Sequence, residues 1–118
     1  MIMGSILEKH KRLSCLDFSV LCRLGYDSSI RGLVNLNDLW RFDSSTREWT
    51  WVAGSSSGNQ GGVYGIKGVA DALNTPGARS EAVSWVDLQG DLWLFGGKGL
   101  TQFALGGSLN DLWKYYRQ

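Results

Sequence analysis

Three residues in the chain carry soft metal-binding side chains: His10, Cys15 and Cys22. A structural zinc site usually needs four such ligands, so this set is too small. The two cysteines lie seven residues apart, which places them beyond disulfide reach on either a helix or a strand. We therefore interpret both cysteines as structural free thiols and expect neither a metal nor a cofactor.

Two carboxylates, Asp87 and Asp91, flank a short Leu-Gln-Gly segment and could attract a cation. The additional oxygen ligands of a calcium loop are missing around them. A solvated turn is the better interpretation.

The stretch FGGKGLT, residues 95–101, superficially resembles a phosphate-binding loop. Such a loop needs Gly five residues before the Lys and Ser or Thr directly after it, but Trp93 and Gly99 occupy these positions. With His10 as the only histidine, the many serines have no evident base for nucleophilic catalysis. The sequence predicts no catalytic residues, and we expect the chain not to be an enzyme.

The amino-acid composition limits the classes of fold and of binding partner that we expect. Twelve basic and 11 acidic residues give a net charge of +1, which is not typical of proteins that bind nucleic acid or anionic membranes. No stretch approaches the ~20 apolar residues of a membrane span. Sixteen Gly and six Trp among 118 residues favour a turn-rich β protein.

Short strands separated by turns account for most of the chain. We predict strands at residues 39–42, 48–52, 82–86, 91–95 and 112–115, turns at 43–46 and 87–90, and long Gly-rich connections at 53–78 and 98–108. In the strand at 91–95, Leu92 and Leu94 fall on one face and Trp93 and Phe95 on the other. Apolar residues on both faces require another layer on each side of the sheet.

One seven-residue segment occurs in two near-identical copies: LNDLWRF at residues 36–42 and LNDLWKY at 109–115, which are 73 positions apart (109 − 36). Repetition at a fixed period usually marks stacked copies of one structural unit. The sequence therefore predicts an all-β fold of antiparallel strands built from such copies.

The segments LWLFGG (92–97) and NDLWKY (110–115) together resemble a Kelch repeat, in which a diglycine closes the second strand and spaced aromatic residues follow. The motif PGAR (76–79), together with the predicted strand at 82–86, resembles the first strand of that repeat. The motif WTW (49–51) resembles a fourth strand. The similarity is greatest to the long-repeat type related to the central domain of galactose oxidase. It implies a β-propeller fragment of about one and a half blades.

The resemblance implies structural roles for particular residues. Gly96 and Gly97 would allow close approach of a neighbouring blade, and Arg79 would donate to backbone carbonyls of an adjacent strand. The aromatic residues that would fill the space between blades are Trp40, Trp49, Trp93, Trp113 and Tyr115. The two Asn-Asp pairs, at 37–38 and 110–111, are expected to hydrogen-bond local backbone.

The resemblance covers residues 25–118, and residues 1–24 depart from it. Leu13, Leu16, Val20 and Leu24 recur at helical spacing, which favours a short amphipathic helix. The alternative is a degraded second strand, because residues 19–22 align with 92–95 when shifted by 73. We expect the chain to be a piece of a larger propeller.

The most plausible function is a non-catalytic module that binds protein or carbohydrate through its long loops. Tyr64, Lys67 and Phe103 are candidate contact residues, although Tyr64 could instead pin its loop to the sheet. The alternatives are a fragment of a galactose oxidase-like enzyme whose copper ligands are absent here, and a non-functional reading frame. Because an incomplete propeller exposes strand edges and apolar faces, the isolated chain is expected to self-associate.

Overall fold

The computed structural model describes residues 17–20 and 24–117, and in these residues it contains strands and turns but no helix. All strand pairs are antiparallel, so the predicted all-β class is confirmed. The strands are β1 Asp17–Val20, β2 Leu24–Asp27, β3 Gly32–Asn35, β4 Leu39–Asp43, β5 Glu48–Ala53, β6 Arg79–Ser80, β7 Val83–Val86, β8 Leu92–Phe95, β9 Lys98–Leu100, β10 Gly106–Ser108 and β11 Leu112–Tyr115. None of these described residues belongs to a helix long and apolar enough to cross a membrane.

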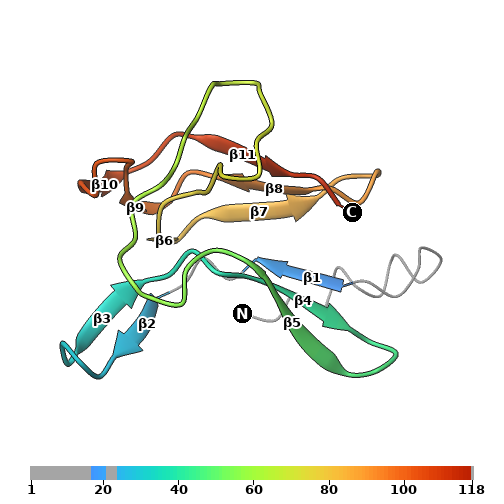
Figure 1. Ribbon diagram of the computed structural model, residues 1–118, viewed down its shortest axis with the longest axis horizontal. Helices are drawn as coiled ribbons and strands as arrows, with labels where there is room; N and C mark the ends of the chain where they lie inside the picture. Colours follow the sequence, from blue (N-terminus) through green and yellow to red (C-terminus); the bar gives the residue numbers. More distant parts are fainter. Residues whose placement is uncertain (1–16, 21–23, 118) are drawn as a thin grey trace.

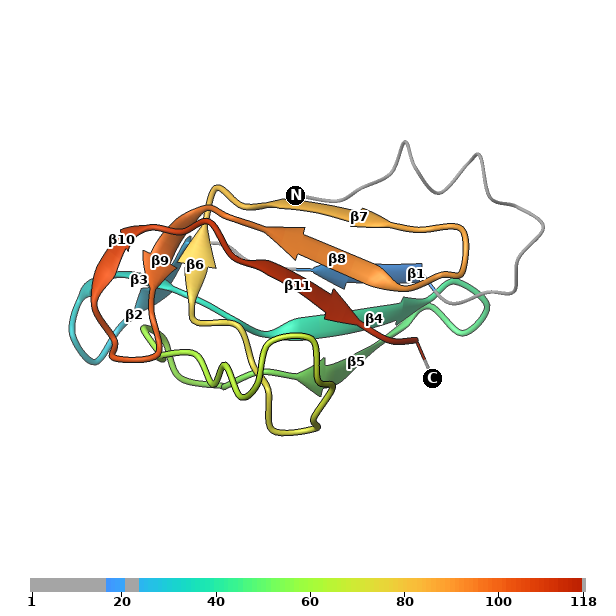
Figure 2. The same ribbon diagram turned by 90° about the horizontal axis from the view of Figure 1, so that it is seen from above.

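Two three-stranded sheets form the body of the molecule. One has the order β1-β4-β5 and the other β11-β8-β7, and they lie as two layers, one over the other (Figure 1). A two-stranded sheet β2-β3 and a three-stranded sheet β10-β9-β6 lie together at one end of these layers (Figure 2). The hairpins of both halves of the chain therefore lie at the same end of the molecule (Figure 2).

The strand pairing repeats along the chain. In the first half β1 pairs with β4, and the hairpin β2-β3 lies between them in sequence; in the second half β8 pairs with β11 around the hairpin β9-β10. β4 and β11 begin 73 positions apart (112 − 39), as the repeated segment predicts. We call residues 17–53 the first unit and residues 79–115 the second unit.

The N-terminal region is a strand where it is described. Asp17–Val20 forms β1 and Leu24 begins β2, so the favoured helix prediction is wrong for these residues; the rest of the predicted helix, like Cys15 and Cys22, lies outside the described part of the chain. The alternative of a second strand is correct in kind but shifted in position. Phe42 and Tyr115 are equivalent positions 73 residues apart (115 − 42), and their strand partners are Asp17 and Leu92. These partners are 75 residues apart (92 − 17), so the observed strand is shifted by two residues from the predicted alignment.

The two hairpins β2-β3 and β9-β10 were not predicted. Residues 98–108 read as a glycine-rich connection, yet Lys98–Leu100 pairs with Gly106–Ser108. Glycine has low intrinsic strand propensity, so composition conceals these strands. Cross-strand backbone hydrogen bonds, rather than side-chain packing, stabilise these strands.

Aspartates fix the turns that join the long strands. In the β4-β5 turn, Asp43 Oδ1 accepts hydrogen bonds from the Ser45 backbone N–H at 2.9 Å and from the Ser45 hydroxyl at 2.6 Å. In the β7-β8 turn, Asp87 Oδ1 accepts from the N–H groups of Gln89 and Asp91, both at 3.0 Å. These bonds to nearby backbone are the reason Asp begins such turns.

The core lies between the two layers. Leu92 and Leu94 are 3% and 6% exposed and lie on the inner face of the second sheet. Together with Leu39 of the first sheet they line a mostly apolar cavity of about 90 Å³. The opposite face of the second sheet is open, since Phe95 is 46% exposed, so only one of the two predicted covering layers lies within the described chain.

Candidate functional site

Arg79 is the most deeply buried polar residue and joins several segments. Its side chain is fully buried and donates to the carbonyl oxygens of Gly77 and Gly96, each at 3.0 Å. Its guanidinium also binds both carboxylate oxygens of Asp111, at 2.6 and 2.8 Å. Its backbone N–H donates to the Leu36 carbonyl in the first unit at 3.1 Å, so this one residue connects both units.

Asp111 collects further donors around this ion pair. The Tyr64 hydroxyl donates to its Oδ2 at 2.6 Å and the Trp113 indole N–H donates to the same oxygen at 2.7 Å. Burial alone would raise the pKa of Asp111, but the hydrogen bonds from Arg79, Tyr64 and Trp113 outweigh it and hold the pKa well below its usual range. Burial and the bond to Asp111 raise the pKa of Tyr64. The cluster is a structural anchor in which Arg79 and Asp111 are charged and Tyr64 keeps its proton.

The first unit contains half of the same arrangement. The Trp40 indole N–H donates to Asp38 Oδ2 at 2.7 Å, as Trp113 does to Asp111. However, Asp38 Oδ1 is buried and has no hydrogen-bond partner. Thus only the second of the two equivalent aspartates is paired with an arginine among the described residues.

The prediction that the Asn-Asp pairs hydrogen-bond local backbone is wrong for Asn37, Asp38 and Asp111. Asn37 bonds distant backbone: its amide donates to the Pro76 carbonyl at 3.1 Å, and its Oδ1 accepts from the Ser55 N–H at 2.9 Å. Asp38 and Asp111 bond side chains instead of local backbone. The contacts of Asn37 and the Arg79–Asp111 pair cross between segments, which local sequence rules do not address.

The other residues that the resemblance singles out are spread over both sheets. Trp93 stacks on Trp85 with ring centroids 6.0 Å apart, and its indole N–H donates to Asp87 Oδ2 at 2.8 Å. That bond is the main reason the pKa of Asp87 is lowered. Trp49 is 49% exposed and lies 4.9 Å from the Phe42 ring.

Tyr115 and the diglycine lie near the second sheet. Tyr115 is half-buried beside the cavity between the layers. Gly96 and Gly97 both have left-handed backbone conformations, with φ of 66° and 93°. A Cβ atom on Gly97 would lie 2.6 Å from the Ser80 carbonyl oxygen, so this close approach requires glycine.

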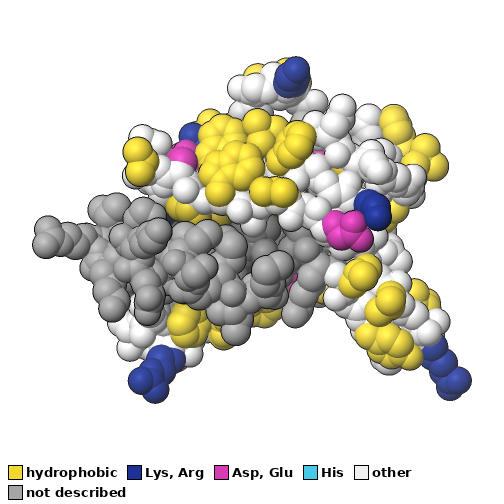
Figure 3. Space-filling model, turned by 180° about the vertical axis from the view of Figure 1, so that it is seen from behind, with side chains coloured by type: hydrophobic (Ala, Val, Ile, Leu, Met, Phe, Trp, Pro, Cys, Tyr) yellow, Lys and Arg dark blue, Asp and Glu magenta, His cyan; other side chains and the backbone are white. Residues whose placement is uncertain are grey.

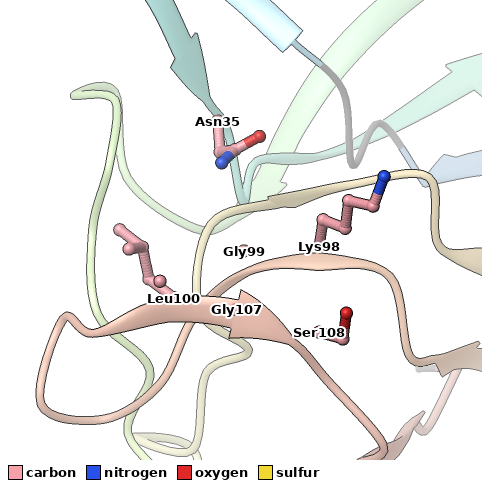
Figure 4. Close-up of a pocket in the computed structure, with 7 residues that line it drawn as sticks. Asn35, Lys98, Gly99, Leu100, Gly107 and Ser108 are labelled. Carbon is pink, nitrogen blue, oxygen red and sulfur yellow. The ribbon is translucent and has the colours of Figure 1, made fainter.

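A shallow open depression of about 320 Å³ lies at the end of the molecule where the hairpins meet. Figure 4 shows side chains from three different strands around it: Asn35 from β3, Lys98 from β9 and Ser108 from β10. The remaining lining residues are Gly99, Leu100, Gly106 and Gly107. The glycines leave backbone groups accessible beside a hydroxyl, an amide and an ammonium group.

The polar groups of this depression are only partly engaged. Lys98 Nζ lies 3.1 Å from Glu81 Oε2, but both side chains are about two-thirds exposed, at 67% and 64%. Asn35 Oδ1 is a buried acceptor with no hydrogen-bond partner. Such a surface can bind hydroxyl or peptide groups of a ligand by hydrogen bonding. The glycine-rich sequence of residues 96–107 was the only sequence feature that pointed to this depression.

The three candidate loop residues are not equivalent. The Tyr64 hydroxyl is bound to Asp111 and its ring lies 5.0 Å from the Trp113 ring, so Tyr64 holds its loop against the sheet. Lys67 is exposed on the connection between β5 and β6. Phe103 is 73% exposed at the turn between β9 and β10. Lys67 and Phe103 thus project from separate loops.

The carboxylates that flank the β7-β8 turn are bound within the protein. Lys114 Nζ lies 3.0 Å from Asp91 Oδ2 and 3.7 Å from Asp87 Oδ2. A hydrogen bond from the Arg117 N–H to Asp91 and the bond from Lys114 lower the pKa of Asp91. No group of three or more His, Cys, Asp or Glu side chains that could hold a metal occurs in the described part of the chain.

No protein-family model matches the chain, and no curated protein matches it in sequence.

Proposed function

We propose that the chain is a non-catalytic module of the Kelch-type β-propeller class that binds a protein or carbohydrate partner through the loops at its hairpin end. The repeated strand pairing supports the repeat class, since β4 and β11 occupy equivalent positions in two stacked sheets. The buried Arg79–Asp111 anchor supports a scaffold role, because it connects the loop of Tyr64 to the sheet.

One observation carries the binding role: the depression lies between the equivalent hairpins of the two units. Asn35 ends β3 of the first unit, and the remaining lining residues come from β9 and β10 of the second unit. A repeat protein that brings the same loop of each unit to one end forms a continuous surface there. Binding groups on loops held by a rigid sheet are the usual arrangement in such scaffolds.

The test is a ligand screen read at residue level. The full chain, labelled with ¹⁵N, is titrated with a panel of neutral disaccharides and with peptides selected on the chain from a displayed library. We expect at least one ligand to shift the amide resonances of Lys98–Leu100 and Gly106–Ser108. A carbohydrate hit and a peptide hit distinguish the two partner classes.

Two tyrosine variants serve as blocker and control. Gly106 shares its strand face with Lys98, Leu100 and Ser108, and the nearest heavy atom to a Cβ there is 3.9 Å away, so Gly106→Tyr should occupy the depression without steric conflict and abolish binding. Gly32→Tyr lies on the equivalent hairpin, where the nearest heavy atom to a Cβ is 3.8 Å away, and should bind as the unmodified chain does. Failure of both ligand sets, or binding that Gly106→Tyr leaves intact, would overturn the proposal.

A further inference from the structure

The second sheet has an apolar outer face that no described residue covers. Cross-strand neighbours Val83, Phe95 and Leu112 share this face and are 61%, 46% and 54% exposed. Trp85, 39% exposed, and Trp93 share the same face. We call these five residues the outer face; Figure 3 shows hydrophobic side chains gathered over β7 and β8.

The first sheet has a face of aromatic residues that no other described residue covers. Trp40 pairs with Trp51 and Phe42 pairs with Trp49, so these four side chains share one face, which we call the aromatic face. Trp49 and Trp51 are 49% and 51% exposed. Exposed apolar patches of this kind usually mark interaction surfaces.

The contact between the two layers shows what covers an outer face. Leu39 and Leu112 occupy the same repeat position, 73 residues apart (112 − 39). Leu39 is only 9% exposed because it lies against Leu92 and Leu94 across the shared cavity, whereas Leu112 is 54% exposed. The outer face of the second unit is therefore the uncovered equivalent of a surface that is covered in the first unit.

The covering surface also has an equivalent. Trp113 pairs with Leu94 on the inner face of the second sheet, and Trp40 is the residue 73 positions before Trp113 (113 − 40) on the aromatic face. The aromatic face is thus the first unit's version of the surface that covers Leu39. Within the described residues, one copy of each of these two mating surfaces is left uncovered.

We propose that the outer face of one chain binds the aromatic face of a second copy, head to tail, in continuation of the contact between its own two units. The pairing is heterologous, since two different surfaces meet. Lys114 pairs with Trp93 across β11 and β8 and therefore lies beside the outer face, with its ammonium 5.0 Å from the Trp93 ring centroid. The proposal concerns a surface separate from the loop end and stands independently of the proposed ligand binding.

Sedimentation equilibrium with complementary variants tests this pairing. Phe95→Lys introduces a charge on the outer face and Trp51→Lys introduces one on the aromatic face. We expect the unmodified chain to gain mass with concentration and each variant to stay monomeric. An equimolar mixture of the two variants should form a species of twice the chain mass, because each variant retains one intact surface and together they form a single interface.

The control is Leu88→Lys, at a residue that is 85% exposed in the β7-β8 turn and outside both faces, which should associate as the unmodified chain does. Near-UV circular dichroism verifies the fold of each variant, and Val83→Lys replaces Phe95→Lys if that variant is unfolded. A monomeric unmodified chain at every concentration would overturn the proposal. So would a mixture that stays monomeric, or association abolished by only one of the two variants, which indicates a symmetric interface.

Discussion

At the residue scale, the two equivalent aspartates should respond differently to the same substitution. Asp111→Asn leaves the fully buried Arg79 without its counter-charge, so we expect a loss of about 3–5 kcal/mol in the free energy of unfolding. Asp38→Asn removes an orphaned carboxylate oxygen and keeps an acceptor for Trp40, so the change should be within about 1 kcal/mol. Urea unfolding of both variants measures the difference.

Comparing Asp111→Asn with Asp38→Asn isolates the contribution of the arginine. The two positions share the indole hydrogen bond and differ in the arginine. Equal losses would show that the Arg79–Asp111 contact does not stabilise the fold.

The pH dependence of stability should reveal the Tyr64–Asp111 bond. The folded pKa of Asp111 lies below its ordinary value of 3.8, so its stabilisation is present at neutral pH and is lost as the pH falls through the acid range. The folded pKa of Tyr64 lies above its ordinary value of 10.0, so its stabilisation is present below that value and is lost as the pH rises past it. Tyr64→Phe should therefore cost about 1 kcal/mol at neutral pH, with a smaller cost at both extremes.

Thermal unfolding of both proteins across the pH range provides the measurement. A constant difference between the unmodified chain and Tyr64→Phe from acid to alkali would contradict the assigned hydrogen bond. Phe preserves the ring contact with Trp113, so the comparison isolates the hydroxyl.

The sequence predicted individual side chains only where their partners were local. The turn role of Asp43 followed from its position before two serines and a threonine, and its bonds to Ser45 are local. The convergence of Tyr64, Arg79 and Asp111 did not follow, because these residues lie 47 and 32 positions apart in sequence (111 − 64, 111 − 79). Only the fold brings them together.

At the element scale, the end of β8 depends on glycine. Gly97→Ala places a Cβ 2.6 Å from the Ser80 carbonyl oxygen in a residue with φ of 93°, so we expect a loss of about 2 kcal/mol or more in the free energy of unfolding. Gly107→Ala, in β10, meets no heavy atom within 4 Å and should change stability by less than about 0.5 kcal/mol. Chemical denaturation of both variants provides the test, and a neutral Gly97→Ala would contradict the close approach.

The long strands were predictable and the short ones were not. β4, β5, β7, β8 and β11 combine apolar or aromatic runs with defined turns, and their predicted ranges agree with the structure to within one residue at each end. β9 and β10 contain three of the glycines and only one large apolar residue, so they show no alternation of apolar and polar side chains. They are recognised only from the backbone pairing in the structure. The helix prediction for the N-terminal segment rested on four apolar residues at helical spacing, but Val20 ends β1 and Leu24 begins β2, so these two belong to different strands.

At the scale of the whole molecule, the repeated segment correctly indicated two copies of one unit. Its spacing of 73 recurs in the pairing of β4 and β11, whereas β1 and β8 differ by 75 because the first unit has two more residues between its paired strands. The sequence could not reveal which face of each sheet is covered, since apolar residues occur on both faces of β8. Burial distinguishes them: Leu94 is 6% exposed and Phe95 46%.

The central claim is that the two units meet through different surfaces, so that Leu39 lies in the interface between the layers and its equivalent, Leu112, lies outside it. Methyl NOE spectroscopy on the Phe95→Lys variant, which removes association through the outer face, tests it directly. The account predicts contacts from the Leu39 methyl groups to those of Leu92 or Leu94, and none to Leu112. Contacts between Leu39 and Leu112, or no contact between Leu39 and β8, would contradict it.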